Sequence, residues 1–409
     1  MFDVAVIGAG AAGMMCAAVA GQRGASVVLI DHASKLAEKI RISGGGRCNF
    51  TNVGTQPANF ISGNPHFCRS ALAGYTPQDF LALLREHGVS WHEKHRGQLF
   101  CDTSSEAIID VLRRECTRAR VAWRMPCTVD SVGQHEHGFT LQTTEGVIQA
   151  RSLVVATGGM AIPQLGATDF GLKLARQFGL KVVEPRPALV PLTFAAPTWA
   201  PFVPLAGLAI EAEVSTGEGK QRTTFLEDVL FTHRGLSGPG ILQISSYWDP
   251  NTPIAIDLAP GRDLTDELMR ARHGNRQQLA TVLGGIWPRR LADAWLSEHG
   301  RSGSSPSLAS LAALRLADVP DRALRALGDA VHRWALFPDG TQGYKKAEVM
   351  SGGVDTRQLD QRSMQARNVR GLHFIGEVVD VTGWLGGYNF QWAWASAVAC
   401  GRAVSAAPG

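Results

Sequence analysis

The chain has 409 residues, of which 45% are hydrophobic and 19% are charged, and its formal net charge is +4. These values are typical of a folded protein with two or three domains, and they exclude a disordered chain. Because the net charge is small for this length, it gives no argument for a nucleic-acid partner, and we expect one to be unlikely.

The cysteines and histidines argue against a metal or disulfide protein. There are seven cysteines, an odd number, and none forms a Cys-x-x-Cys pair. This excludes a disulfide framework, a zinc site or a dithiol redox enzyme as the basis of the fold. His92 and His95 lack an acidic or thiol partner at ligand spacing, so we predict no metal and interpret their segment as a polar loop bordering a substrate cleft.

The apolar stretch from Val4 to Ala20 resembles neither a signal peptide nor a membrane helix. It follows an acidic residue, has no basic segment before it and is interrupted by glycines at turn spacing. We therefore expect a cytoplasmic protein without a membrane segment.

The first 31 residues predict a dinucleotide-binding unit. An apolar strand from Phe2 to Ile7 is followed by a Gly-x-Gly-x-x-Gly motif and an apolar helix. A second strand from Ser26 to Ile30 comes next, and Asp31 follows it directly. The motif consists of Gly8, Ala9, Gly10, Ala11, Ala12 and Gly13. Its glycines permit a tight turn and close approach of a pyrophosphate to the helix N-terminus. Asp31 is placed to bind a ribose hydroxyl, which favours FAD or NAD over NADP.

A glycine-rich segment follows that is incompatible with a stable helix or a central strand. It includes Ser43, Gly44, Gly45, Gly46, Arg47, Cys48 and Asn49. Such a backbone can approach a planar ring or a phosphate closely, while Arg47 and Asn49 supply hydrogen-bond donors. The alternative is a flexible surface loop. Cys48 is the cysteine with a candidate chemical role.

The next 130 residues predict helices and short strands. We expect helices from Thr76 to Glu86 and from Ser105 to Arg118, and then a small β-meander between residues 121 and 150. A buried strand from Ser152 to Val155 ends in Ala156, Thr157, Gly158 and Gly159, where a doubly wound sheet passes close to its dinucleotide. Thr168 and Asp169 open a helix and are equally suited to capping it or to lying near the cofactor.

A change in composition at residues 185–187 predicts a domain boundary. Short strands are expected in residues 188–262 and helices in residues 263–340, where the arginine pattern is typical of a solvated face rather than a nucleic-acid surface. His233 lies in a loop of the first part and is the histidine we would test as an acid or base. The alternative is a hydrogen-bonded structural histidine.

The C-terminal part repeats the pattern of a strand followed by a glycine-rich helix entrance. A buried strand ends in Gly376 and Glu377, with Asp380 shortly after it. We expect these acids to hold ribityl hydroxyls. The helix that begins after Gly386 and Gly387 is expected to face the flavin edge that gains negative charge on reduction.

Taken together, these motifs resemble a bacterial family of NAD(P)/FAD-dependent, aminoacetone-oxidase-like or BaiN-like flavoproteins, within the two-dinucleotide-binding-domain flavoproteins. The matching segments run in order from the first glycine motif through the serine–triple-glycine loop to a Gly-Gly-Tyr-Asn motif. One departure is at residues 166–171, where Gly-Ala-Thr-Asp-Phe-Gly replaces the family's usual Gly-Ser-Thr-Gly-Asp-Gly.

The resemblance implies an α/β fold, with a Rossmann-like FAD-binding domain formed by residues 1–187 and 341–409. A domain with β-barrel-like and helical parts, residues 188–340, is inserted into it. Beyond the residues named above, the implied cofactor-binding positions are Lys39, Tyr388, Asn389 and Gln391.

We therefore predict an FAD-dependent oxidoreductase for a small organic substrate, with NAD(P)H as a possible electron donor. The substrate is expected near Arg47, Cys48, His233 and Asn389, and the first three are the candidate catalytic residues. The alternatives are a flavoprotein that acts on RNA and a flavin-binding sensor without turnover. The substrate and the oligomeric state are not determined by the sequence.

Overall fold

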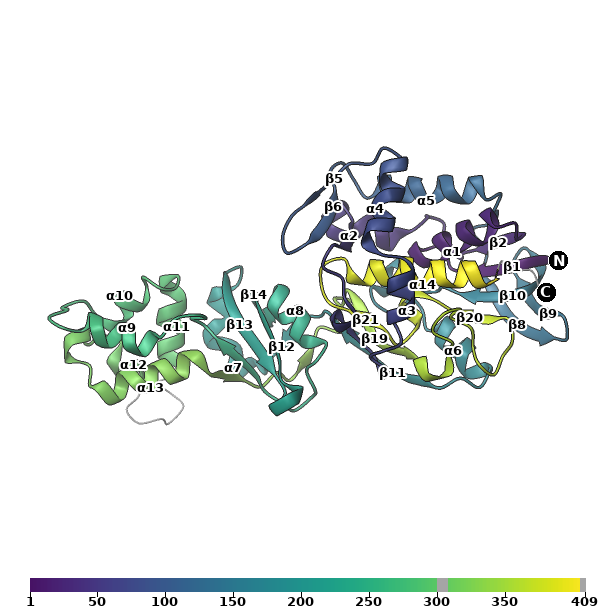
Figure 1. Cartoon of the computed structure of the whole chain (residues 1–409). Helices are drawn as coiled ribbons and strands as arrows, with labels where there is room; N and C mark the ends of the chain where they lie inside the picture. The colour runs from purple at the N-terminus through teal and green to yellow at the C-terminus, as the bar shows by residue number, and fades with distance from the viewer. Residues whose placement is uncertain (300–307, 405–409) are drawn as a thin grey trace. The chain divides into compact units, whose positions relative to one another are not determined.

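The computed structural model describes residues 1–299 and 308–404, which divide into two compact units. The first unit combines both ends of the chain, Met1–Pro187 with the segment that starts at Glu348, and the second is Ala188–Ala347. Figure 1 shows strands and helices mixed in both units.

The main sheet of the first unit is mostly parallel where it carries the glycine motifs. The order is β7 (Ala122–Arg124), β2 (Val27–Ile30), β1 (Phe2–Ile7), β10 (Gly146–Val155), β9 (Gly138–Thr143) and β8 (Val129–His135), and β20 (Leu372–Phe374) also pairs with β10. β1, β2, β7 and β20 run parallel to their neighbours, whereas β8, β9 and the first half of β10 are antiparallel.

Two details correct the sequence prediction of a separate β-meander. β7 joins the parallel edge of the sheet beside β2, and β10 is one continuous strand instead of two. β10 pairs with β9 through its first half and with β1 and β20 through its second half. Both halves therefore satisfy their backbone hydrogen bonds without a break, which sequence periodicity alone does not reveal.

The helices of the first unit pack on this sheet and on each other. The helices are α1 (Ala11–Gln22), α2 (Glu38–Gly46), α3 (Arg69–Gly74), α4 (Pro77–Glu86), α5 (Glu106–Arg118), α6 (Phe170–Gln177) and α14 (Tyr388–Val404). Gly401 of α14 lies against Val19 of α1, where a Cβ on the glycine would be 2.9 Å from the valine, so the two helices approach closely.

Three small sheets complete the first unit. They pair β6 (Gln98–Cys101) with β3 (Asn49–Asn52) on one side and β5 (Trp91–Glu93) on the other, β4 (Phe60–Ile61) with β21 (Thr382–Gly383), and β11 (Val182–Ala188) with β19 (Val349–Val354). The segment we expected to be a polar loop is thus a hairpin, with His92 in a strand opposite Phe100. The aromatic ring of Phe100 stacks on that histidine, which stabilises the strand pairing.

The second unit contains an antiparallel sheet and a group of helices. Its sheet order is β17 (Trp334–Leu336), β16 (Ile254–Asp257), β13 (Ala209–Thr216), β14 (Thr223–Thr232), β15 (Gly235–Ser237), β12 (Leu192–Thr193) and β18 (Gly340–Thr341). β14 is one continuous strand of 10 residues. The helices are α7 (Ala196–Trp199), α8 (Pro239–Ser245), α9 (Leu264–Ala271), α10 (Leu279–Leu283), α11 (Arg289–His299), α12 (Leu308–Leu311) and α13 (Asp321–His332).

An aromatic cluster forms the core beside this sheet. Trp199 stacks on Phe194 with ring centroids 4.8 Å apart, and its indole N–H donates to the carbonyl oxygen of Thr232. Phe231 and Trp334 also pack there, so the strand that leads to His233 is held by large buried rings.

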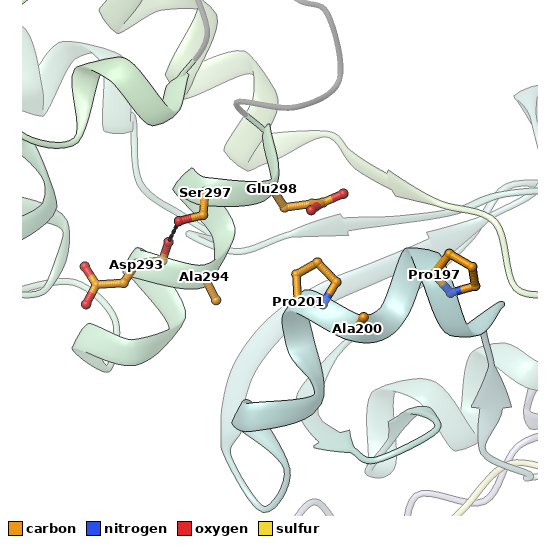
Figure 2. A pocket seen from close by; sticks show the side chains of 7 residues that line it. All are labelled: Pro197, Ala200, Pro201, Asp293, Ala294, Ser297 and Glu298. Atoms are coloured by element: carbon orange, nitrogen blue, oxygen red, sulfur yellow. Dashed lines mark hydrogen bonds between the residues drawn. The ribbon is translucent and has the colours of Figure 1, made fainter.

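A cavity of about 480 Å³ lies within the second unit, between α11 and the segment around α7 (Figure 2). It is lined by Pro197, Ala200, Pro201, Asp293, Ala294, Ser297 and Glu298. The Ser297 hydroxyl donates to the backbone oxygen of Asp293, so it is already engaged. The cavity contains none of the residues that the sequence predicted for the site. Within the described residues, no helix is long and apolar enough to cross a membrane.

Candidate cofactor site

The first glycine motif packs three backbone segments together. A Cβ on Gly8, where φ is +105°, would lie 2.4 Å from the carbonyl oxygen of Ala156. A Cβ on Gly13 would lie 1.8 Å from the carbonyl oxygen of Gly8. Both glycines are therefore required for β1, α1 and the end of β10 to approach one another.

Gly10 differs from Gly8 and Gly13, because the position that a side chain would occupy at Gly10 is open space. It is the N-cap of α1, and a Cβ there would meet nothing within 4 Å. No side chain caps this helix end, and its first turn contains no acidic residue. The backbone N–H groups of the first turn and the positive end of the helix dipole are thus available for an anion such as a pyrophosphate.

One threonine beside this motif has a buried hydroxyl that faces α6. Thr157 Oγ1 is buried and has no hydrogen-bond partner within the described part of the chain. A Cβ on Gly171 of α6 would clash with this oxygen, and Val155 and Val378 lie beside the same point. The hydroxyl is thus enclosed by the protein, where an unpaired polar group costs stability.

Asp31 is held at the end of β2 by two backbone donors. Its Oδ2 accepts from the N–H of Ala9 at 2.6 Å and its Oδ1 accepts from the N–H of Ala33 at 2.8 Å. Each oxygen keeps a further lone pair, because an ionised carboxylate has about four acceptor positions. The carboxylate is thus fixed beside the glycine motif and is able to accept from a ribose hydroxyl.

The serine–triple-glycine segment leaves helical geometry inside α2. Ser43 has an extended ψ of 148°, and Gly44, Gly45 and Gly46 have φ values of +57°, +66° and +85°. Gly44 packs against Phe100, whereas a Cβ on Gly45 or Gly46 would meet nothing within 4 Å. The segment is therefore anchored at one end and presents bare backbone at the other. This is the cradle that a planar ring or a phosphate requires.

Cys48 and Arg47 differ sharply in exposure. Cys48 is fully buried, and burial raises the pKa of its thiol to about 12, so it is protonated at neutral pH. Arg47 is exposed, while its backbone oxygen accepts from the N–H of Cys101 at 2.9 Å. Of the two, only the arginine side chain is accessible to a substrate.

The C-terminal part of the chain meets the first glycine motif directly. A Cβ on Gly376, where φ is +69°, would lie 3.0 Å from the Cβ of Ala12. The N–H of Gly376 donates to Ser396 Oγ of α14, and its carbonyl oxygen accepts from the indole N–H of Trp392. Residues 376 and 12 thus line the same region although they are far apart in sequence.

An ion pair also links the two ends of the chain. Lys39 Nζ lies 2.6 Å from Glu377 Oε2, and Glu377 Oε1 accepts from the N–H of Met350 at 2.9 Å. A Cβ on Gly159 would lie 2.7 Å from Glu377 Oε1, so this glycine leaves room for the carboxylate. The structure therefore brings together three predicted residues from separate segments.

Asp380 and the residues that open α14 are used within the protein. Asp380 accepts from the N–H of Gly63, and burial raises its pKa. Asn389 bonds through both amide atoms to Gly383. Gln391 accepts from Thr51 Oγ1 at 2.6 Å and donates to the backbone oxygen of residue 75. These side chains fix the loop containing Gly386 and Gly387 before the helix.

Sequence reasoning missed the residues that support this loop. Gln98 packs against Gly386, where a Cβ would lie 2.9 Å from its amide, and Thr51 packs against Gly387. The partners are several hundred residues apart in sequence. No local signal identifies such contacts, because they depend on the pairing of β3 with β6 and on the position of α14.

Tyr388 and Asp169 have structural contacts as well. Tyr388 packs edge-on against the ring of Phe60. Asp169 precedes α6 without a side-chain capping bond and instead pairs with Lys173 at 3.0 Å.

His233 belongs to the second unit, at the exposed turn between β14 and β15. Nothing in the described part of the chain hydrogen-bonds its side chain. The structure thus gives no support to the alternative of a hydrogen-bonded structural histidine.

Three side chains of the types that bind metal ions form an ion-pair network instead. Glu86, His87 and Glu115 lie close enough to share a cation. Arg118 already donates to both carboxylates at 2.7 and 2.8 Å, and Gln22 donates to Glu115. The acids are therefore paired with an arginine, which needs no metal ion.

Comparison with known proteins identifies the family. The chain matches the HI0933-like protein Rossmann domain over residues 2–403. The chain belongs to the HI0933-like family. It is 48% identical over 407 residues to the ribosomal RNA dihydrouridine synthase of Escherichia coli strain K12, covering 99% of this chain and 98% of that protein. It is 29% identical over 427 residues to the 3-dehydro-bile acid delta(4,6)-reductase of Clostridium scindens, covering 100% of both.

A solved structure extends the likeness of the fold. The 3-ketosteroid-delta4-(5alpha)-dehydrogenase of Rhodococcus jostii RHA1 has a TM-score of 0.50 to this HI0933-like protein, with 12% identity, and the match covers 99% of this chain and 97% of that one. At this identity the likeness concerns the fold alone.

These findings confirm the family resemblance and the α/β fold class, so the chain is a Rossmann-type flavoprotein. They support FAD as its cofactor and leave the NAD(P)H donor untested. The E. coli relative is named for an activity on ribosomal RNA, so the expectation that a nucleic-acid partner is unlikely has no support from the comparisons.

Proposed function

We propose that this HI0933-like protein is an FAD-dependent reductase that converts a uridine of ribosomal RNA into dihydrouridine. The observation that carries the proposal is the 48% identity to the E. coli ribosomal RNA dihydrouridine synthase across nearly the full length of both chains. A local match to a Rossmann motif would support the cofactor only, whereas this identity also includes the second unit.

The residues present fit FAD in its extended form. Gly10 and the first turn of α1 would hold the pyrophosphate, Asp31 the adenosine ribose, and Gly45 and Gly46 the flavin ring or ribityl chain. When bound and reduced by NADH or NADPH, FAD would supply the hydride for the reduction, and the protein would supply position, charge and access.

The reaction needs a hydride at C6 of the uracil ring and a proton at C5. The C5=C6 bond is conjugated to the C4 carbonyl, so a cation near that oxygen would favour the addition by stabilising the developing negative charge. Arg47 is exposed beside the triple-glycine segment and is our candidate for this cation. Cys48 is unsuited to a direct role because its side chain is fully buried.

His233 is our candidate for the proton donor. Its imidazole is exposed at the turn between β14 and β15, and histidine is the side chain that most often serves as a general acid. Replacing such a group lowers turnover by roughly 100-fold or more, because general acid catalysis contributes about that factor. We expect His233→Gln to reduce turnover by this factor while the FAD content stays unchanged, with Arg234→Gln of the same turn as the matched control. Equal turnover in His233→Gln and wild type would remove the histidine from the reaction.

A second candidate function is reduction of a small conjugated ketone. It is favoured by the 29% identity to the 3-dehydro-bile acid delta(4,6)-reductase over the full length of both chains. The two candidates share one type of chemistry, the saturation of a carbon–carbon double bond conjugated to a carbonyl.

The test uses purified, FAD-loaded protein with NADH or NADPH. Ribosomal RNA transcribed in vitro, which carries no modification, is one substrate, and a 3-keto-4,6-diene steroid is the other. Nucleoside mass spectrometry measures dihydrouridine, and absorbance measures the diene. We expect dihydrouridine in the RNA and little loss of the diene. If the diene is consumed and the RNA gains no dihydrouridine, the proposal is wrong and the second candidate is favoured. If neither NADH nor NADPH reduces the flavin, NAD(P)H is not the electron donor.

A further inference from the structure

The helical part of the second unit is rich in arginine and contains no lysine. Residues 262–333 include eleven arginines, eight acidic residues and no lysine. Arginine binds phosphate in a bidentate manner and stacks on bases, which lysine does not do. The ten arginines of this segment that the structure describes fall into two groups according to their partners.

The first group is neutralised within the segment. Arg262 pairs with Glu267, Arg270 with Asp266, Arg272 with Asp321, and Arg289 lies 3.8 Å from Asp293. Three of these pairs are within five residues of sequence, so they are typical of solvated helix faces. The sequence pattern alone favours this interpretation for all of the arginines.

The second group has no carboxylate partner among the residues that the structure describes. It comprises six exposed arginines, among them Arg290 and Arg333. We call Arg276, Arg315, Arg322 and Arg325 the arginine surface. No hydrogen bond or ion pair of these side chains occurs within residues 1–299 and 308–404. Their charges are therefore not compensated as those of the first group are.

Backbone contacts bring the four arginines into one neighbourhood. Gln278 forms a β-bridge with Arg315, and the N–H of Leu316 donates to the carbonyl oxygen of Gln277 at 2.8 Å. Arg276 is thus next to the segment that carries Arg315. The Arg272–Asp321 pair holds the end of α9 against the start of α13, directly before Arg322.

The packing of α13 turns its arginines outward. Leu324, Leu327 and Val331 are fully buried, and Gly328 packs against Thr265 of α9. Arg322 and Arg325 are three residues apart on the opposite, exposed side.

Two exposed carboxylates, Asp318 and Asp329, lie in the same part of the chain and leave an excess of positive charge. Leu314 is 38% exposed beside Arg315, which adds an apolar contact to the surface.

We propose that the arginine surface binds the phosphate backbone of the RNA substrate. This inference rests on the proposed function, because the partner it names is the ribosomal RNA. When arginines without internal partners contact phosphates, counterions bound to the RNA are released. This release contributes to the binding affinity and does not depend on base sequence. The surface would hold the RNA while recognition of the reacting uridine occurs elsewhere.

The experiment compares two triple variants of the full-length, FAD-loaded protein. The test variant is Arg315→Gln, Arg322→Gln and Arg325→Gln; the control is Arg262→Gln, Arg270→Gln and Arg289→Gln, which removes the same charge from the same segment. Filter binding to a ribosomal RNA fragment is measured over a series of salt concentrations. We expect the slope of log affinity against log salt to fall by about 2 in the test variant, at roughly 0.7–0.9 per lost phosphate contact, and to stay unchanged in the control.

Three readings separate the possible results. The thermal unfolding and the FAD content of both triple variants must match those of wild type. If the test variant does not fold, the single variants Arg315→Gln and Arg322→Gln replace it, each with an expected change in slope of about 0.8. If wild type forms dihydrouridine in the RNA but the test variant keeps the wild-type slope, the inference is wrong and the proposed function stands. If wild type neither binds nor modifies the RNA, the proposed function itself fails.

Discussion

The cofactor region of the first unit and the exposed charges of the second unit differ in how their polar groups are used. Around the glycine motifs, Asp31, Glu377 and Asn389 all have partners inside the protein. In the second unit, His233 and the arginine surface have none among the described residues. The first region is thus prepared for one ligand of fixed shape, as preorganised sites are, whereas the second presents groups that a larger partner can engage.

The largest effect should follow from filling the open space beside Gly10. Gly10→Val meets no atom of the protein, because a Cβ there has nothing within 4 Å and the backbone φ of −82° suits valine. If the pyrophosphate lies there, FAD affinity should fall roughly 1,000-fold, or about 4 kcal/mol. Gly133→Val in β8, which also has open space, is the matched control. Isothermal titration of both apoproteins with FAD measures the difference, and equal affinities would mean that the cofactor lies elsewhere.

The interior of the first unit also predicts a loss of stability in acid. His373 in β20 is buried, its Nδ1 lies 2.9 Å from the Ser363 carbonyl oxygen, and burial lowers its pKa to about 4. Below pH 6.5 the unfolded chain binds a proton that the folded chain does not take up until about pH 4. Stability therefore falls as the pH drops through this window, by up to about 3 kcal/mol.

Denaturant unfolding at pH 7 and pH 5 measures this effect. We expect His373→Gln to be less stable at pH 7 and to lose less stability on acidification than wild type. An equal acid-induced loss in the variant and in wild type would exclude His373 as its source.

Thr157 should respond in the opposite sense to a hydrogen-bonded threonine. Thr157→Val removes a buried hydroxyl without a partner in the described chain, so the free energy of unfolding of the apoprotein should rise by about 1 kcal/mol. Thr51→Val is the control, because Thr51 donates to Gln391 and its loss should destabilise the apoprotein. Thermal unfolding of the two apoproteins measures both signs. A Thr157→Val protein that is less stable without FAD would show that the hydroxyl has a partner in the protein.

The smallest effect is expected at Cys48. Its thiol is buried and has a pKa of about 12, so Cys48→Ser should change turnover by less than about twofold, within the range of a structural substitution. Alkylation of the native protein with iodoacetamide should spare Cys48 until the protein unfolds. A large loss of turnover with unchanged stability would return the thiol to the reaction.

Much of the fold was predictable where the signal is local. The strand Phe2–Ile7, the glycine motif and the helix after it match the structure because period, turn and cap all lie within one short segment. The continuous strand β10 and the hairpin at Trp91 were not predicted, because their pairing depends on strands elsewhere in the chain.

The site shows the same division. The motifs identify the residue types of the cofactor site. The sequence does not tell which of its glycines pack against the protein and which leave space for a ligand. Gly8 and Gly10 have the same local motif, yet the first contacts Ala156 and the second contacts nothing. Likewise, the sequence does not separate arginines that pair with acids from those that do not. For Arg272 that distinction depends on the contact of α9 with α13, which brings Asp321 to it.

The account is tested most directly by a single-turnover experiment with reduced, FAD-loaded protein and unmodified ribosomal RNA in the absence of oxygen. Flavin absorbance and dihydrouridine are measured in the same samples. We predict that the flavin is reoxidised only when RNA is added and that one dihydrouridine forms for each flavin reoxidised. Reoxidation without dihydrouridine, or no reoxidation on addition of RNA, would contradict the proposed function.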